Sequence, residues 1–520
     1  MIALIPLAAA AALAAPTLSD VHVGSGSHPF AGDGRLLATV SPNGDGFRER
    51  AVVGFRLDRA ARVRLEVLRT DTIHPGKQAE VVIWRTERRM APGRRRLVWR
   101  PARSTPPRTY VLRLTATARG RRTVFDNERP GRRRAPVVRI QGIEAGFPLR
   151  SYAPGDPALL TLATDASALR LQVFHYSSER GADYKTAGTP MTAPLPLDWT
   201  GRRNAPRTLD FVRAGDWPSG LYFLRATADD GRLGYAPFIV RPKRFGATSR
   251  VAVVLATNTW QAYNFWDADG DGWGDSWYVS GSVRRIDVRR PYLDFGVPFR
   301  FRDWDLDFIG WLNRTDKRVE FLSDDDLERF ASGAALARAY DLIVFPGHEE
   351  YVTGRAFDLV ERYRDLGGNL LFLAANNFFW RVDREGERLR RVRVWRDLGR
   401  PESALVGVQY IGSDYGGRQA GYVVGDTGWP FDGTGLGRGD VFGLYGIEID
   451  ARTSASPPGT RLLASIPDLM GVGRSAEMTY YETPSGAKVF AAGTLNFAAS
   501  VGDPKVSRLL ENVWTRLSRP

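Results

Sequence analysis

The chain has 520 residues and a formal net charge of +15, with 43% hydrophobic and 25% charged residues. These proportions are ordinary for folded protein and exclude a wholly disordered, collagen-like or multi-span membrane chain. Because the sequence contains no cysteine, disulfides, zinc–thiolate sites, iron–sulfur clusters and thiol nucleophiles are excluded as well.

Residues 1–16 open with an uncharged apolar run that ends in small residues. The run is too short to span a membrane comfortably, and its pattern predicts a signal peptide, although no Lys or Arg precedes it. A buried first strand or a wrongly chosen start codon is the alternative. We therefore expect a secreted or cell-envelope-associated protein. No other apolar run reaches spanning length, so we expect no membrane span in the mature chain.

Residues 36–125 show apolar and polar residues in alternation, for example at Val63, Leu65 and Val67. The alternation predicts strands with one buried face and hence a small β-sandwich. The segment 41–46 (SPNGDG) precedes the first of these strands. It resembles the entry motif of immunoglobulin-like modules in bacterial surface proteins.

The region 85–134 is dense in arginine and contains few acidic residues. Such a region attracts polyanions, and it indicates either a solvated β face or a surface for an anionic cell-envelope polymer. No recognisable nucleic-acid-binding module is present, so we expect no nucleic-acid partner.

Residues 137–245 contain further strand-like runs between Gly and Pro turns and predict a second β-sandwich. From residue 249 the pattern changes, because continuous apolar runs typical of buried parallel strands occur at 251–256, 341–345 and 369–373. Residues 355–366 between the last two runs have helical spacing. This order predicts a βαβ unit. The expected fold class is therefore multidomain β plus α/β: two N-terminal β-sandwiches followed, over 249–520, by a parallel-sheet α/β domain resembling class I glutamine amidotransferases.

Polar and aromatic side chains follow all three apolar runs, in the segments 258–264 (NTWQAYN), 346–351 (PGHEEY) and 374–380 (AANNFFW). The carboxyl ends of parallel strands meet at one edge of a sheet, where ligands bind. Core packing accounts for Trp260, but it accounts poorly for the polar residues, because buried unpaired polar groups are costly. We therefore expect any chemistry at this edge.

Together with 217–222 (WPSGLY), 235–238 (YAPF) and 493–495 (GTL), these segments resemble the N,N-dimethylformamidase large (beta) subunit family over residues 137–520. The resemblance implies amide hydrolysis at a mononuclear iron held by two tyrosines and one glutamate. It implies Tyr351 and Glu448 as ligands and Tyr263 as the second tyrosine, with Tyr292 in reserve. Hard anionic oxygens suit a ferric ion, which polarises an amide carbonyl and acidifies water. The candidates for a general base, or for orienting the ligands, are His348, Glu350 and Asn376.

The segment 267–278 (DADGDGWGDSWY) has the spacing of a calcium-binding loop. Carboxylates at alternate positions converge on one ion, and Gly272 permits the sharp turn. Position twelve is Tyr278 rather than Glu, so the loop is not a complete EF-hand. We expect a structural calcium ion that fixes the loop beside Tyr263, and a solvated acidic turn is the alternative. The predicted calcium ligands are Asp267, Asp269, Asp271 and Asp275.

The first functional hypothesis is an exported metal-dependent amide hydrolase that acts on a small amide substrate. The second is a non-catalytic cell-surface binding protein that retains the same scaffold. A carbohydrate-active enzyme is a distant third, since its paired carboxylates would be Glu349 and Glu350, and adjacent residues rarely converge on one bond. A thioester mechanism is excluded by the absence of cysteine, and no GxSxG elbow supports a Ser-His-Asp hydrolase.

Overall fold

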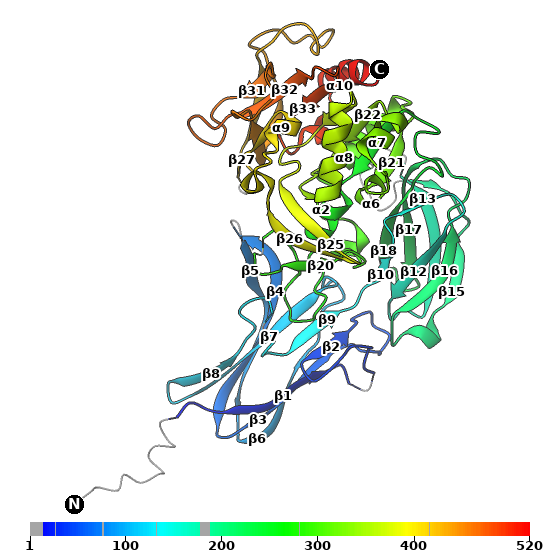
Figure 1. Ribbon diagram of the computed structural model, residues 1–520. Coiled ribbons are helices and arrows are strands. Elements are labelled where there is room, and N and C mark those ends of the chain that lie inside the picture. Colours follow the sequence, from blue (N-terminus) through cyan, green and yellow to red (C-terminus); the bar gives the residue numbers. More distant parts are fainter. Residues whose placement is uncertain are drawn as a thin grey trace, which may run out of the picture.

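Three units follow one another along the chain in the computed structural model (Figure 1). The structure describes residues 14–26, 28–74, 77–131, 133–176, 188–279, 281–414 and 417–519. Residues 1–13, which carry most of the predicted signal peptide, lie outside these ranges. In the described part of the chain, no helix is both long and apolar enough to cross a lipid bilayer.

The first unit consists of two sheets that enclose one core. The smaller sheet contains β1 (Leu18–Gly24), β3 (Ala51–Leu57) and β6 (Gly93–Trp99). The larger has the order β2-β9-β7-β4-β5, with β8 paired to β7, and its strands are β2 (Leu37–Val40), β4 (Ala61–His74), β5 (Lys77–Met90), β7 (Thr109–Ala118), β8 (Arg121–Phe125) and β9 (Val137–Ile140). Val63, Leu65 and Val67 are fully buried between the sheets, as their alternation requires. The prediction of an immunoglobulin-like module stays a prediction.

The second unit also pairs two sheets, one with the order β10-β12-β16 and one with the order β11-β18-β17-β13-β14, in which β15 joins β13. Trp199 and Tyr222 are fully buried in its core. Its elements are β10 (Glu144–Gly146), β11 (Ser151–Tyr152), β12 (Pro157–Ala163), β13 (Ala168–His175), β14 (Thr189–Pro190), β15 (Leu195–Asp198), η1 (Thr200–Arg202), β16 (Arg207–Arg213), β17 (Gly220–Ala228) and β18 (Leu233–Val240).

The third unit contains a nine-stranded sheet with the order β21-β19-β22-β24-β33-β32-β31-β28-β29. Five neighbouring strands are parallel, but from β33 onward every neighbouring pair is antiparallel. The strands are β19 (Val251–Leu255), β21 (Glu320–Ser323), β22 (Leu342–Phe345), β24 (Asn369–Phe372), β28 (Gln419–Val424), β29 (Val441–Gly446), β31 (Arg461–Ile466), β32 (Ala476–Glu482) and β33 (Lys488–Ala491).

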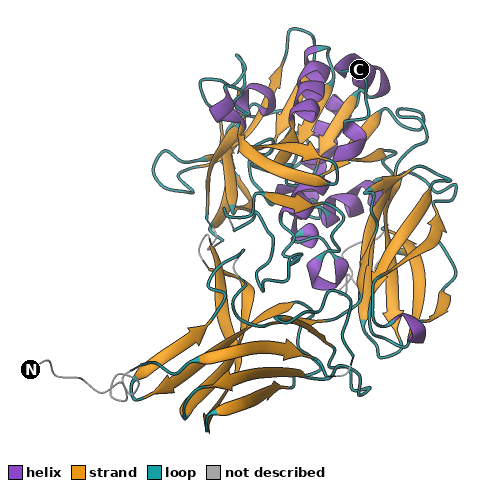
Figure 2. Cartoon of the chain, turned by 60° about the horizontal axis from the view of Figure 1, so that its bottom comes forward, coloured by secondary structure: helices purple, strands orange, loops and turns teal. Residues whose placement is uncertain are grey.

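This mixed sheet corrects the expected fold class, because the predicted parallel-sheet α/β domain and its likeness to class I glutamine amidotransferases are wrong. Strands hold 40% of the residues and helices only 15%, and nearly all helices lie in the third unit (Figure 2). The later strands are joined by turns and loops rather than by crossover helices, and this allows antiparallel neighbours. Two small sheets accompany the large one. The first is mixed, with β23 and β25 parallel and the other pairs antiparallel, and it contains β20 (Arg285–Asp287), β23 (Tyr351–Thr353), β25 (Trp380–Glu385) and β26 (Arg388–Val394). The second is the antiparallel pair β27 (Gln409–Ser413) and β30 (Glu448–Ala451).

Short helices connect and cover the strands of the third unit. The helix α8 (Gly354–Asp365) begins at Thr353, whose side chain accepts a hydrogen bond from a backbone N–H of the first turn, and it leads into β24 as predicted. Gly367 ends the helix with a φ of 95°, in the left-handed region that favours glycine. A side chain at the next residue, Gly368, would overlap the Tyr363 ring. The other helices are α2 (Thr257–Ala262), α3 (Leu293–Gly296), α4 (Phe301–Trp304), α5 (Leu306–Arg314), α6 (Asp324–Leu327), α7 (Gly333–Ala339), η2 (Trp395–Leu398), α9 (Ser403–Val406), η3 (Phe497–Ser500) and α10 (Pro504–Leu517).

Candidate active site

Polar segments follow β19, β22 and β24 at one edge of the large sheet. β22 pairs in parallel with both β19 and β24, so the carboxyl ends of the three strands lie at the same edge even though the sheet as a whole is mixed. The short helix α2 after β19 ends at Tyr263, the loop after β22 carries His348 and Glu350, and the turn after β24 carries Asn376. Glu448 arrives from β30, which lies outside the large sheet.

A buried cluster of hydrogen-bonding side chains forms where these segments meet. The Tyr263 hydroxyl donates to Glu350 Oε2 at 2.5 Å and lies 2.9 Å from His348 Nε2. His348 Nε2 lies 3.3 Å from Glu350 Oε2 and 3.5 Å from Glu448 Oε2. His348 Nδ1 donates to the backbone carbonyl of Ala375 at 3.0 Å, which fixes the ring orientation. The three side chains contacting His348 Nε2 therefore come from segments far apart in the sequence.

Asn376 completes the cluster from a strained backbone. Its φ is 57°, in the left-handed region, and both carboxylate oxygens of Asp450 accept from its backbone N–H, at 2.8 and 3.1 Å. Its side-chain amide donates to Glu448 Oε2 at 2.8 Å. Among the described residues, the Asn376 Oδ1 atom is buried without a hydrogen-bond partner. The Asn376 side chain therefore fixes the Glu448 carboxylate through its amide group. Its Oδ1 atom is left as an acceptor without a partner among the described residues.

Asp450 is a residue that the sequence interpretation missed. It lies two residues after Glu448 on β30, and this spacing places both carboxylates on the same face of a strand. The segment 446–450 (GIEID) contains that signal. The pairing with Asn376 joins residues 74 positions apart, and local spacing does not reveal such a contact.

Burial and mutual charge shift the titration of the cluster. Burial by itself lowers the pKa of His348, but the carboxylates of Glu448 and Glu350 raise it to about 9. Burial raises the pKa of Glu448 to about 6, although His348 and the Asn376 amide act in the opposite direction. Burial and the two carboxylates also raise the pKa of the Tyr263 phenol. At neutral pH the metal-free cluster therefore holds a neutral phenol, an imidazolium and an ionised Glu448.

Other predicted site residues lie beside the cluster or away from it. The Tyr351 ring centroid is 6.1 Å from that of Tyr263, and its phenol hydrogen-bonds with the Arg391 guanidinium. Tyr292 hydrogen-bonds with Gln261 instead. The Glu349 carboxyl faces Asp324, so it does not pair with Glu350 on one bond.

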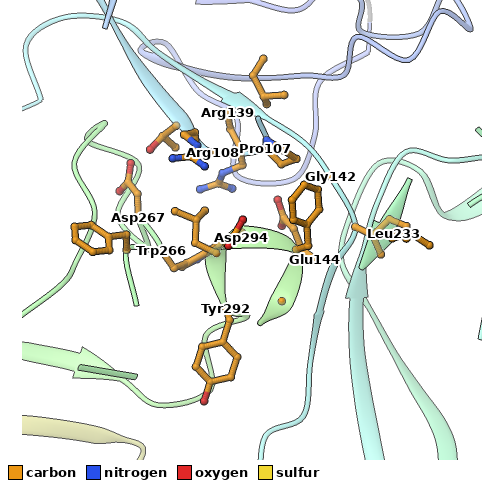
Figure 3. Close-up of a pocket in the computed structure, with 17 residues that line it drawn as sticks. Pro107, Arg108, Arg139, Gly142, Glu144, Leu233, Trp266, Asp267, Tyr292 and Asp294 are labelled. Atoms are coloured by element: carbon orange, nitrogen blue, oxygen red, sulfur yellow. The ribbon is translucent and has the colours of Figure 1, made fainter. Parts of the chain in front are cut away.

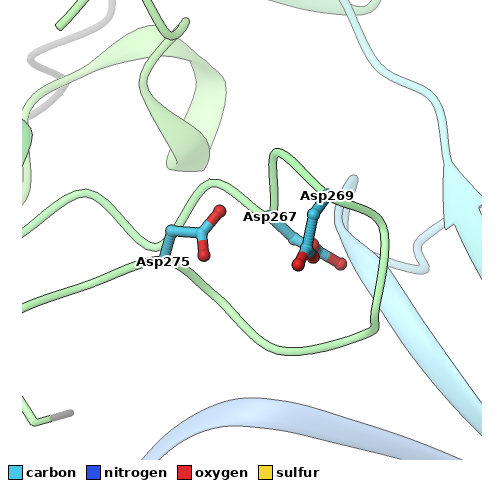
Figure 4. Close-up of side chains that lie close together, drawn as sticks. All are labelled: Asp267, Asp269 and Asp275. Atoms are coloured by element: carbon cyan, nitrogen blue, oxygen red, sulfur yellow. The ribbon is translucent and has the colours of Figure 1, made fainter. Parts of the chain in front are cut away.

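The acidic loop brings together three of its four predicted ligands (Figure 4). Carboxylate oxygens of Asp267, Asp269 and Asp275 lie within 4.8 Å of one another. Asp271 lies outside this group, and its carboxylate accepts hydrogen bonds from the backbone of Gly131 and Trp273. The calcium site stays a prediction with three carboxylates in reach of one ion.

The same loop is anchored in the first unit. The Asn127 side chain donates to the Asp271 carbonyl at 2.9 Å, and the Trp273 indole donates to the Asn127 carbonyl at 2.6 Å. The Thr70 hydroxyl donates to the carbonyl of Gly272, where a side chain would overlap Val111. The loop begins four residues after Tyr263, so the first unit holds the backbone that follows the cluster.

Comparison with known proteins concerns the region that contains this cluster. A family model described as N,N-dimethylformamidase beta subunit-like, C-terminal, matches residues 182–508. The N,N-dimethylformamidase beta subunit of Paracoccus aminophilus is 26% identical, over 58% of this chain and 52% of its own length. The protein of the same name from an Alcaligenes species is 27% identical, over 57% of this chain and 52% of its own length. The chain spans about half the length of these curated relatives. Because the family model covers more than half of the chain, the chain belongs to the N,N-dimethylformamidase beta subunit-like family.

Proposed function

We propose that the protein is an exported metal-dependent hydrolase that cleaves the C–N bond of a small amide. The observation that carries the proposal is the convergence of Tyr263, His348, Glu350 and Glu448 within hydrogen-bonding reach, inside the region that matches the family. Two relatives of this region are named as amide hydrolases. The His348 and Glu448 side chains are only 1% and 8% exposed, which favours a small substrate.

His348 is positioned to move the proton during hydrolysis. Amide cleavage needs a base that takes a proton from water and an acid that returns one to the leaving amine. The Ala375 carbonyl fixes the His348 ring, so that its Nε2 atom faces the cluster. The Asn376 amide holds one oxygen of Glu448 in place, and the unpartnered Asn376 Oδ1 supplies an acceptor for a substrate N–H or for the water.

The charge of His348 and the burial of the cluster both affect how its two carboxylates interact. The imidazolium between two carboxylates offsets part of their charge and orients both. Exclusion of water strengthens these interactions, because charges interact more strongly in a medium of low dielectric constant.

The donor set fits a hard metal ion such as the iron that the resemblance implies. Tyr263 offers a phenol oxygen, and Glu350 and Glu448 offer carboxylate oxygens, which suit Fe(III). These three would hold the ion with His348 beside them, and Tyr351 is the alternative phenol ligand. A bound ferric ion polarises an amide carbonyl and lowers the pKa of water.

Two finer parts of the proposal concern the surface and the acidic loop. Asp267, Asp269 and Asp275 are proposed to bind a structural calcium ion. The arginine-rich region 85–134 is proposed to contact an anionic cell-envelope polymer.

Metal analysis of purified protein tests the function together with two matched variants. We expect stoichiometric iron with a tyrosinate-to-iron absorption band in the wild type, and loss of both the band and amide hydrolysis in Tyr263→Phe. Tyr351→Phe is the control for the choice of ligand, since it removes the same atom from the neighbouring ring. A wild type that binds no metal and hydrolyses no small amide would leave the non-catalytic binding protein as the function of this scaffold.

A further inference from the structure

The arginines of the first unit fall into two groups, according to whether an acidic side chain lies beside them. On the larger sheet, Arg64 pairs with Glu87 at 2.7 Å, and Arg113 pairs with three carboxylates. In the cleft between the three units (Figure 3), the charges of Arg139 and Glu144 act on each other. The fold itself therefore offsets the charge of these arginines.

The outer face of the smaller sheet carries arginines of the other group. Val53 and Phe55 of β3 face the core, so the residues between and beyond them face outward. On this outer face Arg56 lies directly opposite Arg94 of β6, and Arg96 follows two positions along β6. All three arginines are exposed, and their side chains have no hydrogen bond or ion pair with a described residue. The sheet lies at the end of the molecule opposite the nine-stranded sheet (Figure 1).

The same face continues at the other end of the two strands. Ala51 pairs with Trp99, and the exposed residues Arg50 and Arg100 lie just beyond this pair. The paired outward positions of β3 and β6, which the structure describes in full, contain no acidic side chain. We call this set of arginines the arginine stripe; it consists of Arg50, Arg56, Arg94, Arg96 and Arg100.

The acidic residues nearest to the stripe along the chain are engaged elsewhere. Glu49 accepts hydrogen bonds from two backbone N–H groups of the turn 41–46. Asp58 lies beyond the end of β3 and pairs with Arg59 at 3.0 Å. Asp20, at the bulge of β1, lines a separate cleft beside β8. The positive charge of the stripe is therefore not offset by these carboxylates.

The arrangement of the stripe favours an anion that repeats along a line. Like charges directly opposite each other destabilise a sheet, and Arg56 and Arg94 form such a pair. A ligand that brings phosphates removes this repulsion, and guanidinium groups bind phosphate through paired hydrogen bonds. Successive outward residues of one strand are about 7 Å apart, so Arg94 and Arg96 present their charges at this interval. Phosphodiesters that are joined through a three-carbon unit recur at a comparable interval.

The outward positions of β3 and β6 do not favour a nucleic acid. Single-stranded nucleic acids are held by aromatic side chains on which their bases stack. The paired outward positions of these two strands contain no Phe, Tyr or Trp. The stripe therefore offers contacts to the charged chain of a polymer but no platform for bases.

We propose that the arginine stripe binds a linear phosphodiester polymer of the cell envelope, of the poly(glycerol phosphate) class. The inference rests on the proposed contact between region 85–134 and an anionic polymer, and it names the chemistry and the face of that contact. It adds Arg50 and Arg56, which lie outside the region, and excludes paired arginines such as Arg113. It does not depend on amide hydrolysis by the buried cluster.

Equilibrium binding of the full chain to immobilised poly(glycerol phosphate) tests the proposal. The test variant replaces three arginines of the stripe together, as Arg56→Gln, Arg94→Gln and Arg96→Gln. We expect its affinity at low salt to fall by at least about tenfold, and the slope of log affinity against log salt to decrease by about 2, because three phosphate contacts are lost. Its melting temperature should not fall, since the change removes charges that repel each other, and its metal content should equal that of the wild type.

A control variant removes the same charge from the third unit. Its three arginines are about half exposed, each pairs with an acidic residue, and none lies on the stripe. The control substitutions are Arg285→Gln, Arg289→Gln and Arg461→Gln. We expect this variant to bind poly(glycerol phosphate) as the wild type does.

The outcomes separate the inference from the broader proposal on which it rests. The inference is overturned if the stripe variant binds like the wild type, or if the control variant loses as much affinity. If the carboxylate polymer hyaluronate binds the wild type as tightly, the phosphodiester chemistry is wrong but the contact with an anionic polymer stands. A wild type that binds neither polymer refutes both. Binding only to vesicles of phosphatidylglycerol and phosphatidylcholine would make the stripe a membrane-binding face instead.

Discussion

The contact between Asn127 and the acidic loop yields the sharpest prediction about stability and function together. Asn127 is fully buried, and its side chain accepts from the backbone N–H groups of Arg134 and Ala135, at 2.6 and 2.8 Å. It also donates to the carbonyl of Asp271 at 2.9 Å. Asn127→Ala leaves these three backbone groups without their partner. An unsatisfied buried group costs about 1–3 kcal/mol, so we expect a loss of about 3–5 kcal/mol in the free energy of unfolding.

The assay is urea unfolding followed by tryptophan fluorescence, with metal content measured on the same samples. Asn127→Asp is the second variant, since it keeps the acceptor oxygen but loses the donor to Asp271 and adds a negative charge beside the acidic loop. We expect both variants to reduce metal content or amide hydrolysis, because the loop follows Tyr263. A change below about 1 kcal/mol for Asn127→Ala, or normal function in both variants, would refute the view that the first unit holds this loop.

Three further outcomes can be measured on single variants. Calcium chelation should lower the melting temperature of the wild type but not of Asp269→Ala, and identical melting with and without chelator would dismiss the site. Burial raises the pKa of Glu144 from 4.5 to about 7, so the unfolded chain releases this proton at lower pH than the folded one. Stability relative to Glu144→Gln should therefore fall by about 1–3 kcal/mol between pH 4.5 and 7 and then level off, and parallel pH profiles would contradict this. Gly368→Ala should destabilise by about 2 kcal/mol or more, because the new methyl group overlaps the Tyr363 ring, and chemical denaturation reports the loss.

Local patterns predicted the strands and helix that carry the candidate site. The apolar runs at 251–256, 341–345 and 369–373 correspond to β19, β22 and β24, and the helical spacing between the last two corresponds to α8. These predictions succeed because a buried strand needs apolar side chains on both faces and a surface helix needs one apolar stripe. The extension to a parallel sheet over the whole region failed. β31, β32 and β33 are joined by short turns, and an apolar run carries no information on the direction of its neighbour.

The sequence by itself determined which residue types stand at the ends of those strands, and the family to which the region belongs. The polar segments after the strands indicated His348, Glu350 and Asn376. The resemblance to the family implied Tyr263 and Glu448. Only the tertiary structure decided that Glu448 and Asp450 meet Asn376, since contacts across 72 and 74 residues depend on how the small sheet of β27 and β30 packs against the large one. Only the tertiary structure showed, too, that the loop after Tyr263 is held by the first unit. Periodicity is a property of neighbouring residues, whereas a site is a property of segments that folding brings together.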